Sequence, residues 1–302
     1  MTAPALSDAP TFLILGCGFT GTEVARRAID AGHRVIATTR SAERREELEK
    51  LGVDLRVEPA LTGDLVRSWM GPNVNVLVAF APDGHTDAEI APELSAAGAL
   101  VYVSTTGVYG ATRGHVDEST PVDGAEPRAA QRLEAERCYR DAGAAVVRAA
   151  GIYGPGRGLH LRLKSGTFRV PGEGTGVVSR IHVADLAQMI LGVFRRAREG
   201  ERGAIFVAAD DTPVPQMEAI AWLCRRLGLP LPAHVPLDLA PSTLRHDRAV
   251  DNHRIKSWTG LSLLFPSYRE GFEACLADEV VNPLDSAAPR AEKPPGSLPP
   301  SE

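Results

Sequence analysis

Short apolar runs alternate with amphipathic stretches through the first half of this chain. The runs occupy residues 11–16, 33–40, 53–57, 74–80, 99–105 and 144–151. Each run predicts a strand, because an apolar run of about four to eight residues is typical of a strand in a buried sheet. Helices are expected between them: one with Val24, Ala25, Ala28 and Ile29 on a single face and an end at Gly32, one over 42–51 capped by Ser41, and one over 127–142.

The alternation itself predicts the fold class. Strands that alternate with helices form a parallel, doubly wound α/β sheet with right-handed crossovers. The order of strand, helix, strand, helix and strand at the start fits the dinucleotide-binding half of a Rossmann fold. The sequence therefore predicts a Rossmann sheet for the first half of the chain.

The second half of the chain is less regular. It is rich in Gly and Pro from Gly151 to Gly176, and then predicts a helix over 183–197, a strand over 204–209 and a helix from Pro213 to Gly228. We expect a smaller substrate lobe, built mainly from 151–180 and 205–281, across the carboxyl ends of the strands. In open α/β sheets the ligand binds outside those ends.

The two ends of the chain lack apolar periodicity. Residues 1–10 and 282–302 are rich in Pro, Ala, Ser and charged residues, which predicts disorder and leaves a folded unit over 11–281. The 302 residues carry a net charge of -5, which favours small molecules or a second copy as partners over nucleic acid or an anionic membrane. We therefore expect a small-molecule substrate and a homodimer.

Cysteine spacing and hydropathy bear on the compartment. The four cysteines, Cys17, Cys138, Cys224 and Cys275, lie far apart and form no C-x-x-C pair, so neither a zinc site nor a disulfide framework is expected. No apolar run approaches the ~20 residues of a membrane span, and the first residues do not resemble a secretory signal. These features predict a cytoplasmic protein without a metal.

A glycine-rich turn follows the first predicted strand. Gly16, Gly18 and Gly21 form the sequence G-C-G-F-T-G at the start of the first helix. In a dinucleotide site the first glycine permits a tight turn, the second lets the pyrophosphate approach the backbone, and the third lets helix and strand pack closely. The amides of Phe19 and Thr20 would face the phosphates. The alternative is an ordinary strand-to-helix turn.

The end of the second strand bears on the choice of dinucleotide. An acidic residue there would bind the ribose 2′-hydroxyl of NAD, whereas an arginine accommodates the 2′-phosphate of NADP. This chain has Thr39 and Arg40, with no acidic residue before Glu43, which favours NADP over NAD. Arg40 as a solvated residue at a helix start is the alternative. Further cofactor contacts are expected where the fourth and sixth strands end, from Ala79, Phe80, Ala81 and Tyr153.

Four further motifs in order carry a family resemblance. They are STTGVYG at 104–110, AAGIYGPGR at 149–157, RIHVADLA at 180–187 and FPSYREGF at 265–272. With the glycine loop, they make the chain resemble the short-chain dehydrogenase/reductase superfamily, and within it the extended or atypical NAD-dependent epimerase/dehydratases. The resemblance covers roughly 11–275 and implies a Rossmann fold, a bound nicotinamide dinucleotide and a substrate lobe on the C-terminal side.

The resemblance also implies catalytic positions, and two of them differ here. The family uses a Ser or Thr that binds the substrate oxygen, which falls on Thr105, and a Tyr-x-x-x-Lys pair, which falls on Arg128 and Arg132. An arginine, with a pKa above about 12, stays protonated and is a poor proton shuttle. Arg128 and Arg132 lie four apart on one helical face, where they form either a clamp for a carboxylate or phosphate or a solvated basic face.

Several other residues are candidates for the proton donor. Tyr109 and Tyr153 follow strand ends that face the expected site, where the family resemblance favours a role in shaping the pocket. His85 and His115 fall in loops, and His182, followed by Asp185, is explained by helix capping and packing. Water or Tyr109 therefore remains as the source of the proton. Arg180 is a candidate to face the substrate, but the sequence does not place it.

Three functions remain open from the sequence. The first is an NADP-dependent oxidoreductase or epimerase/dehydratase-like enzyme with an altered catalytic helix, acting on a small polar or anionic substrate. The second is a non-catalytic NADP(H)-binding or sensing protein, favoured by the missing tyrosine. The third is a non-redox lyase or isomerase that uses the same pocket.

Overall fold

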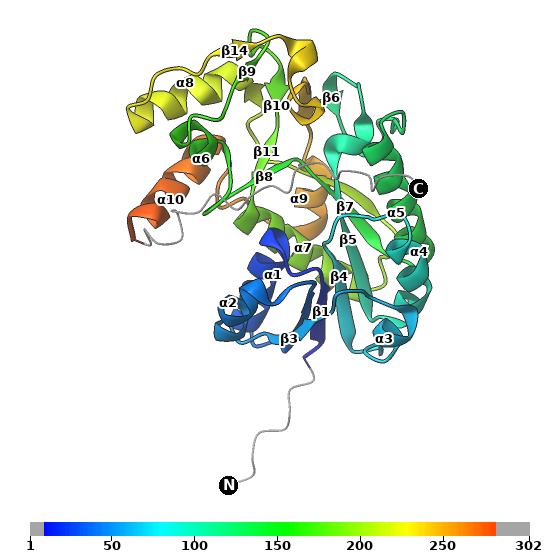
Figure 1. Ribbon diagram of the computed structural model, residues 1–302. Helices are drawn as coiled ribbons and strands as arrows, with labels where there is room; N and C mark the ends of the chain where they lie inside the picture. Colours follow the sequence, from blue (N-terminus) through cyan, green and yellow to red (C-terminus); the bar gives the residue numbers. More distant parts are fainter. Residues whose placement is uncertain (1–8, 282–302) are drawn as a thin grey trace, which may run out of the picture.

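The structure is a computed structural model that describes residues 9–281. The predicted disordered ends, apart from residues 9 and 10, therefore lie outside the described residues. Figure 1 shows a sheet with helices on both faces and a group of smaller elements beyond one end of its strands.

Seven parallel strands form the main sheet, in the order β12-β7-β5-β4-β1-β2-β3. Their bounds are β1 Thr11–Leu15, β2 Val35–Thr39, β3 Asp54–Val57, β4 Val74–Val78, β5 Ala99–Thr105, β7 Ala145–Ala149 and β12 Ile205–Ala208. The strand order reverses between β1 and β4, which is the switch point where such sheets bind ligands. The predicted Rossmann fold is confirmed.

Helices cover both faces of this sheet, which explains why its strands are apolar at successive positions. The bounds of the main helices are α1 Phe19–Asp30, α2 Arg45–Lys50, α3 Gly63–Arg67, α4 Thr86–Ile90, α5 Pro127–Asp141, α7 Val183–Arg198 and α9 His253–Thr259. Phe12 and Ile14 of β1 pack in the core cluster that contains residues of α1 and α7, whereas Leu13 and Leu15 pack in the cluster that contains residues of α5. Successive residues of a strand point to opposite faces, so both faces of β1 are dry.

The helix predicted over 42–51 is broken in the structure. A single 3-10 turn, η1 Ala42–Arg44, precedes α2, and the Ser41 side chain makes no capping hydrogen bond. The prediction of a Ser41 cap was therefore wrong. The Arg44 side chain reaches back to the carbonyl of Cys17 and the hydroxyl of Thr22, which ties this turn to the glycine loop.

Two predicted elements of the second half also differ in their bounds. The run 144–151 does not continue as one strand, because the chain leaves the main sheet after Ala149 and continues as β8 Gly151–Tyr153 beside β11 Arg180–His182. The helix predicted from Pro213 begins at Gln216 instead, as α8 Gln216–Leu227. The residues just before it form β13 Val214–Pro215, which pairs with β10 Val177–Val178.

Short strand pairs and three helices form the lobe. The bounds of its remaining elements are β6 Gly114–Val116, α6 Leu159–Lys164, β9 Val170–Pro171, β14 His234–Val235, η4 Leu237–Leu239, η5 Ser242–Leu244, β15 Arg248–Val250 and α10 Tyr268–Val281. Two further 3-10 turns, η2 Ala91–Ala96 and η3 Thr106–Tyr109, lie in the first half of the chain. Phe168, Leu223 and Phe272 belong to the core that α6, α8 and α10 share. Figure 1 shows these three helices side by side beyond the sheet, whereas β12, from the range predicted for the lobe, lies in the main sheet. Within the described residues, no helix combines the length and the hydrophobicity that crossing a membrane requires.

Candidate functional site

The glycine loop lies between the end of β1 and the start of α1. Gly16 has a φ of +88°, and a Cβ there would lie 2.8 Å from the Cβ of Phe80. A Cβ at Gly21 would lie 2.9 Å from the carbonyl oxygen of Gly16, so only glycine lets α1 pack this closely on the loop. A Cβ at Gly18 would meet no atom within 4 Å, which leaves open space against its backbone. Each glycine thus has the surroundings that the dinucleotide motif requires.

The start of α1 offers an anion site at this loop. Phe19 and Thr20 are its first two residues, and amides in the first turn of a helix have no acceptor within that helix. The first turn carries no acidic side chain to offset the positive end of the helix dipole. The open backbone of Gly18 and these amides fit a pyrophosphate group.

The end of β2 holds the loop in place. The Gly16 amide donates to Thr38 Oγ1 at 3.0 Å, and the Cys17 amide donates to the Thr38 carbonyl oxygen at 2.8 Å. Thr39 Oγ1 donates to the Ser41 carbonyl oxygen instead of facing the loop. Arg40 is exposed and forms no hydrogen bond or ion pair with any described residue. Its guanidinium is therefore free for a ligand beside the loop.

The chain after β4 and the chain after β8 border the same loop. The Ala79 amide donates to the Leu15 carbonyl oxygen at 2.9 Å, and Phe80 packs against Gly16, while Ala81 is exposed. Ala79 and Phe80 therefore lie at the glycine loop, whereas no contact of Ala81 with the loop is seen among the described residues.

Arg157 is a residue of this region that the sequence interpretation did not assign. Its guanidinium carbon lies 5.4 Å from the ring centre of Phe19, and a Cβ added at Gly154 would lie 3.1 Å from that ring. Arg157 is exposed, so a second cation stands beside the first turn of α1. Its position within the quoted motif 149–157 was the available signal.

Tyr153 is oriented away from the loop. Its ring packs on Phe272 with centroids 4.4 Å apart, and its hydroxyl lies against Gly271 of α10. The Tyr153 side chain is buried in the lobe core, so in this orientation it does not make the predicted contact with the cofactor. Only its backbone neighbour Gly154 adjoins the glycine loop.

Thr105 ends β5 and Tyr109 lies four residues further on, but only Thr105 has a hydroxyl proton that is not engaged in a hydrogen bond. Thr105 Oγ1 accepts from the Gly107 amide at 3.1 Å, which leaves its own O–H to donate. The Tyr109 hydroxyl is fully buried, donates to the Asp117 carbonyl oxygen at 2.8 Å and accepts from Arg148. Burial raises the pKa of Tyr109 above its ordinary value. Tyr109 therefore has no proton available for a substrate in this arrangement.

Sequence and structure comparisons place the chain among known proteins. A model of the NAD dependent epimerase/dehydratase family matches residues 85–209. A solved structure from Silicibacter pomeroyi, of a conserved protein of unknown function, is 33% identical, with a TM-score of 0.77 over 89% of this chain and 99% of that chain. A putative NAD-dependent epimerase/dehydratase from Methylobacillus flagellatus is 27% identical, with a TM-score of 0.71 over 90% and 99% of the two chains.

This chain belongs to the NAD-dependent epimerase/dehydratase family. A curated relative, the 3-diazoavenalumate denitrifying reductase of a Streptomyces species, is 32% identical over 171 residues, or 52% of this chain. The match spans 55% of that relative, about half of its length.

Helix α5 carries the two arginines at which the sequence resemblance expects the catalytic tyrosine and lysine. Arg128 lies in the first turn of α5, exposed and without a hydrogen bond or ion pair to any described residue. Arg132 instead donates to the Tyr102 hydroxyl at 2.8 Å and to the Val103 carbonyl oxygen at 3.3 Å. The two guanidiniums therefore point to different surroundings, one to solvent and one to β5. This does not favour the joint clamp expected from their spacing.

A buried polar network lies between α5 and the sheet, and sequence reasoning missed it. Arg148 of β7 forms a two-pronged ion pair with Glu136 of α5, with the closer contact at 2.7 Å, and Ser104 donates to the same carboxylate. Both charged side chains are nearly inaccessible to solvent. A lone arginine within the apolar run 144–151 was the available signal.

The three histidines considered as proton donors lie in different surroundings. His182 Nδ1 accepts from the Ala184 amide at 3.2 Å and caps α7, as predicted. Asp185 accepts from the amides of Leu264 and Phe265, which fixes the chain before α10. His85 and His115 are exposed beside Asp83 and Asp251.

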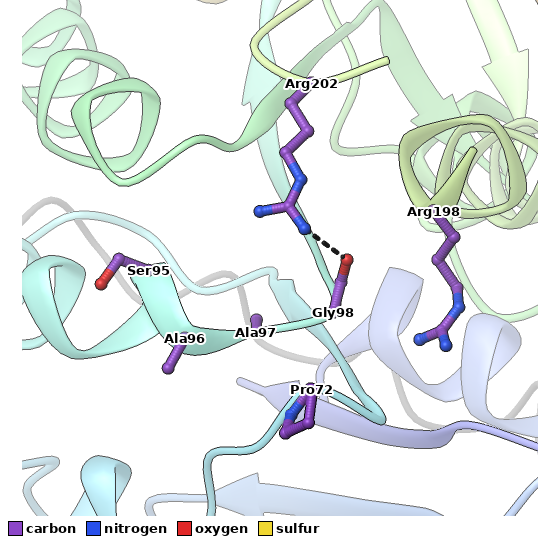
Figure 2. A pocket seen from close by; sticks show the side chains of 7 residues that line it. All are labelled: Pro72, Ser95, Ala96, Ala97, Gly98, Arg198 and Arg202. Atoms are coloured by element: carbon purple, nitrogen blue, oxygen red, sulfur yellow. Dashed lines mark hydrogen bonds between the residues drawn. The ribbon is translucent and has the colours of Figure 1, made fainter. Parts of the chain in front are cut away.

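A hollow of about 360 Å³ lies at the opposite end of the strands from the glycine loop (Figure 2). It is lined by Pro72, Ser95, Ala96, Ala97, Gly98, Arg198 and Arg202. Pro72 and Gly98 precede β4 and β5, so this hollow lies at the amino ends of the strands. It is separate from the glycine loop, which lies at the carboxyl ends.

Proposed function

We propose that this protein is an NADP(H)-dependent oxidoreductase that reduces a small polar or anionic substrate without a tyrosine acid. The proposal is supported by the cofactor loop of residues 16–21 and by the exposed Arg128 of α5, where the sequence resemblance expects the catalytic tyrosine. The name of the Streptomyces relative, a denitrifying reductase, supports a reductive reaction. Loss of the tyrosine argues against the usual proton transfer and leaves hydride chemistry intact.

NADP is favoured over NAD by the end of β2. The side chains there are Thr38, Thr39 and Arg40, and the first carboxylate after them is Glu43. Arg40 has no partner among the described residues, so a 2′-phosphate would supply the anion that it lacks. A ribose 2′-hydroxyl would find no carboxylate at the end of the strand.

The residues of this chain have separable roles in such a reaction. A reduced nicotinamide dinucleotide supplies a hydride when it is bound. The amides of Phe19 and Thr20 hold its pyrophosphate, and Thr105 donates its free O–H to the substrate oxygen. Arg128 would stabilise negative charge without moving a proton. Because the Tyr109 proton is already engaged, water supplies the proton that completes the reduction.

A sensing function is the second candidate. Its support is the engaged hydroxyl of Tyr109 together with Arg128, because neither group delivers a proton. A protein that binds NADP(H) and responds to it would need the loop of residues 16–21 but not Thr105.

Binding and turnover measured together distinguish the two candidates. NADPH binding is followed by its fluorescence, and its oxidation by absorbance at 340 nm against aldehydes, ketones, 2-oxo acids and an aryl diazo compound. Tight binding with turnover of at least one class supports the oxidoreductase. Tight binding without turnover across the panel supports the sensor, and absence of binding overturns both.

A further inference from the structure

Three buried polar side chains beyond the end of β7 lack the partners that burial normally requires. Arg180, Asp210 and Tyr153 are 8%, 2% and 2% exposed. The Arg180 guanidinium makes one long hydrogen bond within the described chain, from Nη1 to the Val178 carbonyl oxygen at 3.3 Å. Asp210 Oδ1 accepts from the Thr212 amide at 3.2 Å, but Asp210 Oδ2 and the Tyr153 hydroxyl have no partner among the described residues. Buried polar groups are almost always paired, so a polar ligand would supply the missing partners.

The cluster lies at the same edge of the fold as Thr105. Ala149, the last residue of β7, is in register with Thr105 on one side and with Ala208 on the other. Two residues further along, Gly151 is in register with Arg180, whose carbonyl oxygen accepts from the Asp210 amide at 2.6 Å. The carboxyl ends of the strands thus bring Thr105, Arg180 and Asp210 to one region.

Gly151 keeps the space between these residues open. It is exposed, and a Cβ added there would meet only the Ser179 carbonyl oxygen, at 3.6 Å. A molecule lying over Gly151 would therefore meet backbone and not a side chain.

Arg180 has no ion-pair partner in the described part of the chain. Asp210 is near enough to interact electrostatically, as are Tyr153 and Tyr268, but no carboxylate forms an ion pair with Arg180 in the described part of the chain. Burial raises the pKa of Asp210 to about 7, so this carboxyl is partly protonated at neutral pH. A protonated carboxyl and a phenol are both donors, which adds two neutral donors to the cation.

We propose that Arg180 binds a carboxylate of the substrate, with the Tyr153 hydroxyl and Asp210 completing the site. The planar guanidinium matches a carboxylate with two parallel hydrogen bonds. A phosphate dianion fits less well, because Asp210 adds negative charge whenever it is ionised. The assignment rests on the proposed function and narrows its substrate to an organic acid whose reducible group lies over Thr105 while its carboxylate lies beyond Gly151.

Binding of carboxylates to the NADP⁺-saturated protein tests the assignment without turnover. Calorimetric titrations compare acetate, benzoate and cinnamate with their primary amides and with inorganic phosphate. We expect at least one carboxylate to bind at least about tenfold more tightly than its amide, and Arg180→Met to remove that preference. Arg140→Met, an exposed arginine on α5, is the matched control and should change neither affinity.

Several results would overturn the carboxylate site. They are a carboxylate preference that persists in Arg180→Met, equal binding of acids and amides, and preferential binding of phosphate. If Arg180→Met loses NADP⁺ affinity or has a lower thermal midpoint than the unaltered protein, Arg180→Lys is used to test the carboxylate site. It keeps the charge but not the paired geometry, and should bind the carboxylate at least about threefold more weakly than the unaltered protein.

The proposed carboxylate site and the proposed reductase activity can be disproved independently of each other. Carboxylate binding that depends on Arg180, without NADPH oxidation, leaves the site in place and removes the reductase. Turnover of a panel compound with a KM that is unchanged in Arg180→Met leaves the reductase in place and removes the site.

Discussion

Arg148 donates from Nη1 to the hydroxyl oxygen of Tyr109 at 3.1 Å, in a region closed to solvent. That hydroxyl donates in turn to the Asp117 carbonyl oxygen. A tyrosine at the mouth of the expected site is thereby a structural group. We expect Tyr109→Phe to change kcat by less than about threefold and to lower the free energy of unfolding by about 1–3 kcal/mol, because it leaves Arg148 and the Asp117 carbonyl short of a partner. Urea denaturation and steady-state kinetics measure both. A large loss of kcat at unchanged stability would make Tyr109 the proton donor.

Thr105 should matter for chemistry and not for folding. Thr105→Ala removes the O–H that donates to the substrate oxygen, so we expect kcat/KM to fall by about 10²-fold. Thr105→Ser retains the hydroxyl and should recover most of that loss. NADPH affinity, measured by fluorescence, should be unchanged in both variants. Equal kinetics in the alanine and serine variants would place the reacting oxygen elsewhere.

Arg40 should decide the cofactor preference. Arg40→Ala removes the cation that we propose binds the 2′-phosphate, so we expect the Kd for NADPH to rise at least about tenfold while that for NADH stays the same. Arg45→Ala is the matched control, because Arg45 is exposed nearby and pairs with Glu49. If both cofactors weaken equally, Arg40 supports the loop and does not select NADP.

Gly18 tests the position of the pyrophosphate. A Cβ added at Gly18 would meet no atom of the protein within 4 Å, so Gly18→Val should fold normally. The same side chain would occupy the place of the pyrophosphate, and NADPH binding should fall below detection. Gly71→Val, another position with open space, is the control and should leave binding intact. The thermal midpoint of each variant separates lost binding from lost folding.

His182 should make stability depend on pH. Burial lowers its pKa from 6.5 to about 4, so below pH 6.5 the unfolded chain binds a proton that the folded chain does not. Its contribution to stability is therefore intact above pH 6.5 and is lost as pH falls towards 4. We expect His182→Asn, which keeps a capping acceptor, to lose stability less steeply than the unaltered protein between those pH values. Identical slopes in urea titrations at several pH values would contradict this.

The fold was predictable where the information was local. The continuous apolar run from Phe12 to Leu15 was enough to predict a strand there. The spacing of Gly16 and Gly21 after that strand was enough to predict the tight turn and the close helix packing. The Ser41 cap was not formed, and the Arg44 contacts with Cys17 and Thr22, which are distant in sequence, could not be predicted from spacing.

The site was less predictable, for the same physical reason. Arg180 and Asp210 come together because β11 pairs with β8 and the Asp210 amide binds the Arg180 carbonyl oxygen, which is long-range pairing that no spacing reveals. The proton of Tyr109 is engaged by residues at 117 and 148, so its role also depended on tertiary contacts.

The contact between Tyr153 and Gly271 has a mechanical consequence. Gly271 has no side chain, so the backbone of α10 rests directly on a ring carried by β8, which continues the chain of the main sheet. β8 and α10 are joined here by close packing and not by a flexible link. We therefore expect ligand entry to proceed by displacement of loops, with β8 and α10 moving as one body.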